Sequence, residues 1–212
     1  MKAVIFDMDG VLVDSEPKNL EQLNGFYEEN GTKVSEAFLH SLVGSSYEYT
    51  YKESVRVMKK DWTIDEFTEA FDEYVHHHSF GYDEVLNPGV KDILVWLKEH
   101  GYKTAVASSS SMHQIQTMEH VCELEGCFDE ILSGEMFKES KPNPEIYLTA
   151  AKKLGVEPHE CIAVEDSMYG IEAGTRAGMK VLAYRDERYG VDQSKAYAII
   201  DHMEDIKKYV SE

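Results

Sequence analysis

The sequence predicts an α/β fold in which a doubly wound parallel sheet carries a helical unit inserted after its first strand. Short apolar runs without polar alternation recur along the chain, and such runs are typical of strands that are covered on both faces. From about residue 88 onward, amphipathic helical patterns separate these runs, which indicates βαβ units. Residues 16–84 break this rhythm, because they contain helical patterns and no β run of comparable quality.

The first expected strand covers residues 2–8, where four successive residues, Ala3 to Phe6, are apolar. The later expected strands share this short apolar character and cover residues 103–107, 131–132, 161–164, 181–183 and 198–200. Since a strand buried on both faces belongs inside a sheet flanked by helices, we expect all of these runs to lie in one parallel sheet.

Three helices are predicted between these strands. An apolar i, i+3, i+4, i+7 stripe over residues 90–97 ends at Gly101, a residue type that commonly follows a helix. A second stripe covers residues 115–122. A third helix is expected to begin with Asn143 as its N-cap and to stop at Gly155.

The break in the pattern predicts the domain organisation. Thr63 and Glu66 form a capping-box pattern that opens one helix of the inserted stretch. We therefore expect an α/β core made of residues 1–15 and 85–212, and a helical insertion made of residues 16–84. Glycine, proline and asparagine cluster at both junctions, which is typical of hinges.

Composition excludes several classes of function. The 212 residues include 21 Lys and Arg against 40 Asp and Glu, so the net charge is −19. Such a balance argues against nucleic-acid and anionic-membrane partners, which need clustered basic residues. The three cysteines show no C-x-x-C spacing, and no signal peptide or membrane-length apolar run is present. We expect a cytoplasmic protein.

Polar clusters follow the first two expected strands. Asp7 and Asp9 lie at the end of the first expected strand, and their spacing places both side chains on one side of an extended backbone. Two neighbouring carboxylates repel each other unless a cation or a shared proton intervenes. Ser108 and Ser109 follow the second strand, where hydroxyl and backbone N–H groups can face an anion.

Two further clusters follow later strands. Lys141 precedes the helix that begins near Asn143, and Glu165 and Asp166 follow the strand at residues 161–164. Because the carboxyl ends of parallel strands meet at one edge of the sheet, we expect all four clusters to converge there. Asp7, Asp9 and Asp166 would supply the oxygen ligands that Mg²⁺ prefers. A hard cation, a hydroxyl group and an ammonium group together suit a phosphoryl group.

The same segments resemble the four motifs of the haloacid dehalogenase-like (HAD) superfamily. They are DMDGVLVDSE, the serine after the second strand, KPNPE and VEDSxxGIxAGxxAGM. The helical insertion after the first motif resembles the family's C1 cap, and the whole chain is similar to its β-phosphoglucomutase-like and phosphoglycolate-phosphatase-like hydrolases. The resemblance implies a Rossmann-like core and a Mg²⁺-dependent phosphatase acting on a small phosphorylated metabolite through an aspartyl-phosphate. It also implies a monomer, and the acidic composition already argues against nucleic-acid and membrane partners.

The resemblance assigns the chemistry and the metal. Asp7 matches the family's nucleophile, and Asp9 matches its general acid and base. Mg²⁺ would be held by Asp7, Asp166 and the backbone carbonyl of Asp9. Glu165 matches a residue outside the metal shell that orients its neighbours.

The family resemblance also assigns the residues that would bind the phosphate group. Ser108, with Ser109 beside it, would hold phosphoryl oxygens. Lys141 would neutralise charge on the nucleophile and on the phosphoryl group.

A sugar-phosphate mutase of the β-phosphoglucomutase type is the alternative. Such mutases typically carry a histidine where Asn19 stands, and a lysine and an arginine in the cap where this chain has Val43 and Tyr47. They usually carry Lys-Asn where this chain has Ser111 and Met112. Since these cations would bind the second phosphate of a bisphosphate intermediate, their absence favours the hydrolase.

Overall fold

The computed structural model describes residues 1–45 and 47–211, and of Tyr47 and Glu48 it describes the backbone alone. The chain forms two compact units. One consists of residues 1–14 and 82–212, and the other of residues 15–81. In the described part of the chain, we find no helix that combines the length and the apolar character needed to cross a membrane.

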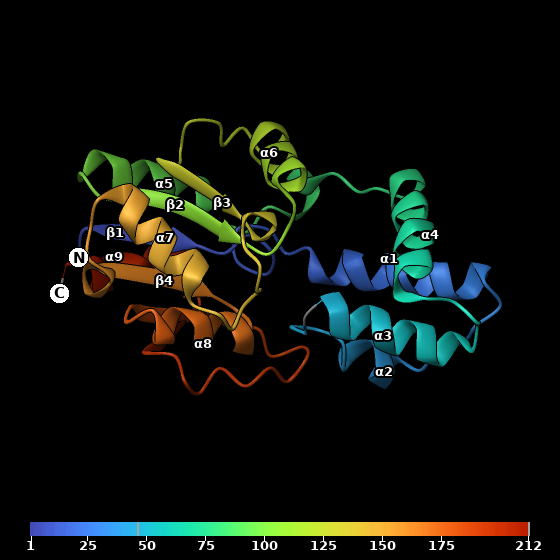
Figure 1. Cartoon of the computed structure of the whole chain (residues 1–212). Helices are drawn as coiled ribbons and strands as arrows, with labels where there is room; N and C mark the ends of the chain where they lie inside the picture. Colours follow the sequence, from blue (N-terminus) through green and yellow to red (C-terminus); the bar gives the residue numbers. More distant parts are fainter. Residues whose placement is uncertain (46, 212) are drawn as a thin grey trace. The chain divides into compact units, whose positions relative to one another are not determined.

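The larger unit is built on a six-stranded sheet in which every pairing is parallel (Figure 1). The strands are β1 (Ala3–Phe6), β2 (Lys103–Ser108), β3 (Glu130–Ser133), β4 (Cys161–Glu165), β5 (Lys180–Tyr184) and β6 (Ala198–Ile200). Their order in the sheet is β3-β2-β1-β4-β5-β6. The expected doubly wound parallel sheet is confirmed, and each predicted strand lies at or within two residues of an observed one.

Helices cover both faces of this sheet. One face packs against α5 (Val90–Glu99), α6 (Met112–Val121) and α9 (Ile206–Val210), and the other against α7 (Glu145–Leu154) and α8 (Met168–Arg176). In β1, Val4 and Phe6 belong to the first core and Ala3 and Ile5 to the second. Both faces of the strand are therefore buried, which explains its unbroken apolar run.

Short 3₁₀ helices connect several of these elements: η1 (Tyr82–Val85), η2 (Gly134–Met136), η3 (Pro158–Glu160) and η4 (Met203–Asp205). The start of α7 differs from the prediction by one residue. Its N-cap is Pro144, not Asn143, although Asn143 Oδ1 still accepts a hydrogen bond from the Glu145 amide at 2.9 Å. The asparagine thus satisfies a free amide of the first turn from one position further out.

The smaller unit is helical. Phe26 lies at the centre of an aromatic core and contacts the rings of Phe67, Phe71 and Tyr74 edge to face. The predicted capping box is present at the start of the helix Ile64–His77, where the Thr63 hydroxyl accepts from the Glu66 amide and the Glu66 carboxylate accepts from the Thr63 amide. The helices of this unit are α1 (Glu16–Glu29), α2 (Glu36–His40), α3 (Tyr47–Met58) and α4 (Ile64–His77).

The sheet has one topological switch point, which lies between β1 and β4. The chain order reverses between β1 and β4, and in open α/β sheets ligands bind outside the carboxyl ends of the strands at such a switch point. Asp7 follows β1, and Asp166 follows β4. The topology therefore brings the first and last polar clusters of the sequence to neighbouring strand ends.

Candidate active site

Strand register aligns the polar clusters at the carboxyl edge of the sheet. Phe6 is paired with Val106 of β2 and with Val164 of β4, so the next residue, Asp7, stands level with Ala107 and Glu165. The Asp7 amide extends this pairing by donating to the Val164 carbonyl at 3.0 Å. The central strand thus places the Asp7 carboxyl group between the ends of its two neighbours.

The side chain of Lys141 is buried at this carboxyl edge of the sheet. Its ammonium donates to Asp7 Oδ1 at 2.8 Å, to Glu165 Oε1 at 2.5 Å and to the Ala107 carbonyl at 2.9 Å. These bonds use all three N–H donors of the group, which compensates for its removal from water. Burial alone would lower the pKa of Lys141, but the charges of Asp7 and Glu165 outweigh it and raise that pKa. The side chain therefore remains a cation.

Glu165 accepts hydrogen bonds on both of its carboxylate oxygens and is 0 % exposed. Tyr147 donates its hydroxyl to the same Oε1 atom at 2.5 Å, and Ser167 donates to Oε2 at 3.3 Å. Burial and the nearby carboxylates raise the pKa of Tyr147 well above its usual value, so the phenol stays a donor. Gly170 completes the enclosure, because a Cβ at this position would lie 1.9 Å from Glu165 Cδ.

The site carries an excess of negative charge. Oxygen atoms of Asp7, Glu165 and Asp166 lie within 4.8 Å of one another, and all three residues are buried. Burial raises the pKa of Asp7 to about 8, against the opposing attraction of Lys141 and with support from the charge of Glu165. Three carboxyl groups face one ammonium group, so the cluster favours a further cation.

These residues fit a magnesium ion. The donor set consists of carboxylate oxygens, which Mg²⁺ prefers, and it is held on strand ends. Gly10 adopts a positive φ of 77°, and a Cβ there would lie 2.1 Å from Asp166 Oδ2. The turn after Asp9 therefore passes directly against the Asp166 carboxylate, which a larger residue would displace.

Asp9 is connected to the serine loop after β2. Ser110 donates its hydroxyl to Asp9 Oδ2 at 2.6 Å, and the Ser110 amide donates to Ser108 Oγ at 3.0 Å. Ser108 is buried at the end of β2, whereas Ser109 is exposed. Of the two serines predicted to bind phosphate together with Lys141, Ser108 thus belongs to this network and Ser109 lies at the surface.

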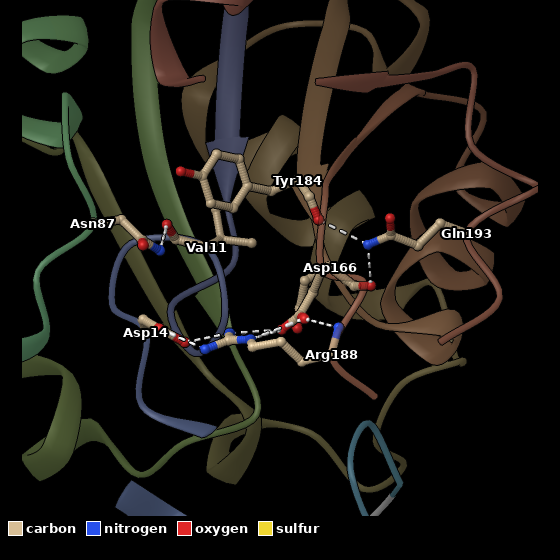
Figure 2. A network of polar contacts seen from close by, with 8 residues as sticks. Val11, Asp14, Asn87, Asp166, Tyr184, Arg188 and Gln193 are labelled. Carbon is tan, nitrogen blue, oxygen red and sulfur yellow. Dashed lines mark hydrogen bonds and ion pairs between the residues drawn. The ribbon is translucent and has the colours of Figure 1, made fainter. Parts of the chain in front are cut away.

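A second polar network supports the edge from the side of β5 (Figure 2). The Gln193 side chain donates through Nε2 to the backbone carbonyls of Asp166 and Tyr184 at 2.8 and 2.7 Å, which joins the ends of β4 and β5. Arg188 binds Asp14 through both terminal nitrogens at 2.6 and 2.8 Å. The loop after β5 thereby holds both the backbone of Asp166 and the segment that follows Asp9.

The structure brings Asp7, Lys141, Glu165 and Asp166 into one cluster, as expected from their positions after the strands. Asp9 is linked to Ser108 through Ser110.

Ser110, Tyr147 and Gln193 contribute to the site but were not among the predicted site residues. Tyr147 occupies an apolar-stripe position of α7, where an aromatic residue is indistinguishable from ordinary core. Ser110 stands in a run of four serines, and no local pattern marks Gln193.

Comparison with known proteins identifies phosphatases among the relatives of this chain. A phosphorylated carbohydrates phosphatase of Thermotoga maritima is 33% identical over 183 residues, covering 85% of this chain and 83% of that protein. Hexitol phosphatase B of Escherichia coli K12 is 31% identical over 181 residues, covering 84% and 81%. The crystal structure of a β-phosphoglucomutase from Clostridium difficile superposes with a TM-score of 0.83 at 25% identity, covering 100% of this chain and 96% of that one.

The family model named haloacid dehalogenase-like hydrolase matches residues 4–184, which begin in β1 and end with β5. The matched span therefore contains every residue of the buried cluster, from Asp7 to Asp166, together with the inserted helices. This chain belongs to the haloacid dehalogenase-like hydrolases and is an enzyme of that family.

Proposed function

We propose that this chain is a Mg²⁺-dependent phosphatase that hydrolyses a small phosphorylated metabolite, a sugar phosphate or a similar phosphomonoester, through an aspartyl-phosphate on Asp7. It is a HAD-type phosphatase, a phosphomonoester hydrolase. The observation that carries the detailed proposal is the buried cluster in which Lys141 binds both Asp7 and Glu165 beside Asp166.

In the first half of the reaction, a carboxylate oxygen of Asp7 attacks phosphorus and forms a new P–O bond. The bond between phosphorus and the alcohol oxygen breaks, and Asp9 gives its proton to that oxygen. Lys141 holds Asp7 through Oδ1 and offsets negative charge that gathers near the reacting group. The products of this half are the free alcohol, a phosphorylated Asp7 and an ionised Asp9.

In the second half, a water molecule attacks phosphorus while Asp9 accepts a proton from it. The bond between phosphorus and the Asp7 oxygen breaks, which releases inorganic phosphate and restores the Asp7 carboxylate. Asp9 returns to its protonated form, so the cycle consumes one water molecule and leaves the enzyme unchanged. One residue thus acts as acid and then as base.

The remaining predicted residues bind rather than react. The buried Ser108 hydroxyl, with the exposed Ser109 beside it, would bind phosphoryl oxygens. Asp7, Asp166 and the backbone carbonyl of Asp9 would hold the metal. When bound, Mg²⁺ would polarise a phosphoryl oxygen and neutralise negative charge.

Glu165 acts outside the metal shell in this proposal. Its Oε1 atom already accepts from Lys141 and from Tyr147, both at 2.5 Å. A carboxylate held in this way orients the lysine that supports the nucleophile.

The names of the curated relatives support the substrate class. Two of them are called a phosphorylated carbohydrates phosphatase and a hexitol phosphatase, at 33% and 31% identity. The inserted unit, which begins at Ser15, six positions after Asp9, is the cap in this proposal and selects among these phosphates. Residues 16–84 were its expected extent, and the compact unit of the structure covers residues 15–81.

The mutase remains the second candidate, because a β-phosphoglucomutase is among the structural neighbours. Its second phosphate needs cations in the cap, and Val43 supplies none where a lysine would be expected. The side chain of Tyr47, the other position in this comparison, lies outside the described part of the chain. The hydrolase is therefore the function we propose.

A screen of phosphorylated metabolites with Mg²⁺ tests the proposal. We expect phosphate release by the wild type and none by Asp7→Asn, which keeps the shape of the side chain but removes the nucleophilic charge. Asp92→Asn, an exposed change on α5, is the matched control and should retain activity. Phosphate release by Asp7→Asn at the wild-type rate would contradict the nucleophile assignment. Faster conversion of β-glucose 1-phosphate to the 6-phosphate than hydrolysis of either would establish the mutase.

A further inference from the structure

Ser110 contacts the side chain that the reaction needs to orient, yet it lies outside the predicted set of site residues. Its hydroxyl donates to Asp9 Oδ2 at 2.6 Å, a short hydrogen bond between residues 101 positions apart. The serine is 2 % exposed. It is therefore a buried donor directed at the proposed acid and base.

The backbone of Ser110 is itself fixed at two points. Ser133, the last residue of β3, donates its hydroxyl to the Ser110 carbonyl at 2.7 Å. The Ser110 amide donates to Ser108 Oγ at 3.0 Å, and Ser108 and Ser133 are register partners in the sheet. The donor to Asp9 thus stands on the ends of two paired strands, not on a free loop.

Close packing limits the loop further. A Cβ at Gly134 would lie 2.8 Å from the Ser109 carbonyl oxygen, so the chain after β3 passes directly against the loop after β2. A donor with so little freedom can hold a carboxylate in one orientation. General acid catalysis depends on such an orientation, since the acid must lie within hydrogen-bond reach of the leaving oxygen.

We propose that Ser110 is a positioning residue that holds the Asp9 carboxyl group in the orientation from which it protonates the leaving alcohol. This inference rests on the proposed function, because it assumes that Asp9 is the general acid. Ser110 needs no contact with the substrate to act in this way, and its own hydroxyl is not consumed. Its loss should affect proton delivery and leave phosphate binding intact.

Two esters separate proton delivery from other effects. The alkoxide of a hexitol phosphate needs a proton to depart, whereas the nitrophenolate of 4-nitrophenyl phosphate is a stable anion that departs without one. The quantity to compare is kcat/KM, which covers the steps up to release of the alcohol and excludes the shared hydrolysis of phosphorylated Asp7. The inhibition constant of inorganic phosphate reports ground-state binding separately.

We expect Ser110→Ala to lower kcat/KM for hexitol phosphate by roughly tenfold or more, part of the 10²–10⁴-fold that a positioned acid contributes. The value for 4-nitrophenyl phosphate should fall much less, and the inhibition constant of phosphate should stay unchanged. Ser133→Ala, which removes the anchor of the Ser110 carbonyl, should produce the same bias with a smaller loss. Ser110→Thr keeps the hydroxyl and should restore part of the hexitol phosphate activity.

Ser111→Ala is the matched control from the same loop. Ser111 caps α6 in a capping box with Gln114, so its loss should weaken the helix end without a bias between the esters. Equal losses on both esters in Ser110→Ala, no loss, or a raised inhibition constant for phosphate would overturn the positioning role. A wild type that releases phosphate from none of the screened esters would overturn the proposed function together with it, so the two failures are distinguishable.

Discussion

A single methyl group added at Gly170 should impair the active site, because it would displace the Glu165 carboxylate. Gly170 lies in the first turn of α8, and a Cβ there would stand 1.9 Å from Glu165 Cδ and 2.0 Å from each of its carboxylate oxygens. Real Cβ atoms essentially never approach another atom closer than 3.0 Å. In Gly170→Ala the Glu165 carboxylate must therefore move by about 1 Å, or the first turn of α8 must shift away from β4.

The cost follows from what that carboxylate binds. Lys141 and Tyr147 both donate to Glu165 Oε1 at 2.5 Å, and a shift of about 1 Å breaks or lengthens both bonds. Each bond to a charged group is worth about 1.5–3 kcal/mol. The gain in helix propensity from alanine, at most about 1 kcal/mol, does not offset two of them. We expect the free energy of unfolding to fall by about 2–5 kcal/mol.

Activity should fall as well, because Lys141 loses one of the groups that hold it against Asp7. Removing a single preorganised charge-stabilising donor from an active site typically lowers kcat by about 10²–10³-fold. Gly170→Ala displaces such a donor without deleting it, so we expect a loss near the lower end of that range. The measurements are urea unfolding and kcat/KM for 4-nitrophenyl phosphate with Mg²⁺.

Gly174→Ala, one turn later on the same helix, separates stability from activity. A Cβ at Gly174 would lie 2.8 Å from Val181 Cγ2 and 3.2 Å from Ala163 Cβ, which are packing atoms away from the charged cluster. Overpacking of this kind costs about 1–3 kcal/mol. Both variants should unfold more easily, and only Gly170→Ala should lose most of its activity. Equal activities in the two variants would refute the link from Gly170 through Glu165 to Lys141.

Two further predictions concern the same cluster. Mg²⁺ should stabilise the wild type by about 2.7 kcal/mol at one hundred times its dissociation constant, read as an increase in Tm, and Asp166→Asn should abolish most of this increase. The Tm increase of the wild type should be larger above pH 8 than below it, because burial raises the pKa of Asp7 to about 8 and the metal competes with the proton that Asp7 retains below that pH. A Tm increase that does not depend on pH would contradict this competition. Tyr147→Phe should lower the free energy of unfolding by about 1.5–3 kcal/mol, since it removes one donor from the buried Glu165 carboxylate. Urea unfolding measures this loss, and a variant as stable as the wild type would count against a structural role for the phenol.

The sheet could be predicted because its central strands leave a pattern that survives without tertiary information. Residues 3–6 of β1 are buried on both faces, so no polar residue interrupts them, and the same holds for the core of β4. The one-residue error at α7 has a local cause. Asn143 and Pro144 are both common at helix starts, and sequence alone does not decide which residue is the N-cap.

The cluster residues could be predicted for a related reason. Asp7, Glu165 and Asp166 are placed by their distance from a strand end, and the parallel topology then brings the ends together. Ser110 and Gln193 could not be found in this way. Their roles depend on single side chains that cross between strands, from Ser110 to Asp9 over 101 positions and from Gln193 to Asp166 over 27.

The negative charge of the site indicates that a phosphorylated substrate needs a bound cation in order to bind. The molecule carries a net charge of −19, and within the cluster three carboxyl groups face the single ammonium of Lys141. A phosphate monoester would approach this surplus of negative charge against repulsion. A bound divalent cation would cancel it, so we expect the proposed Mg²⁺ to be required for phosphate binding as well as for the chemistry. The acidity of the surface then does not hinder the reaction, because attraction at the site is local and is supplied by the metal, Lys141 and the Ser108 hydroxyl.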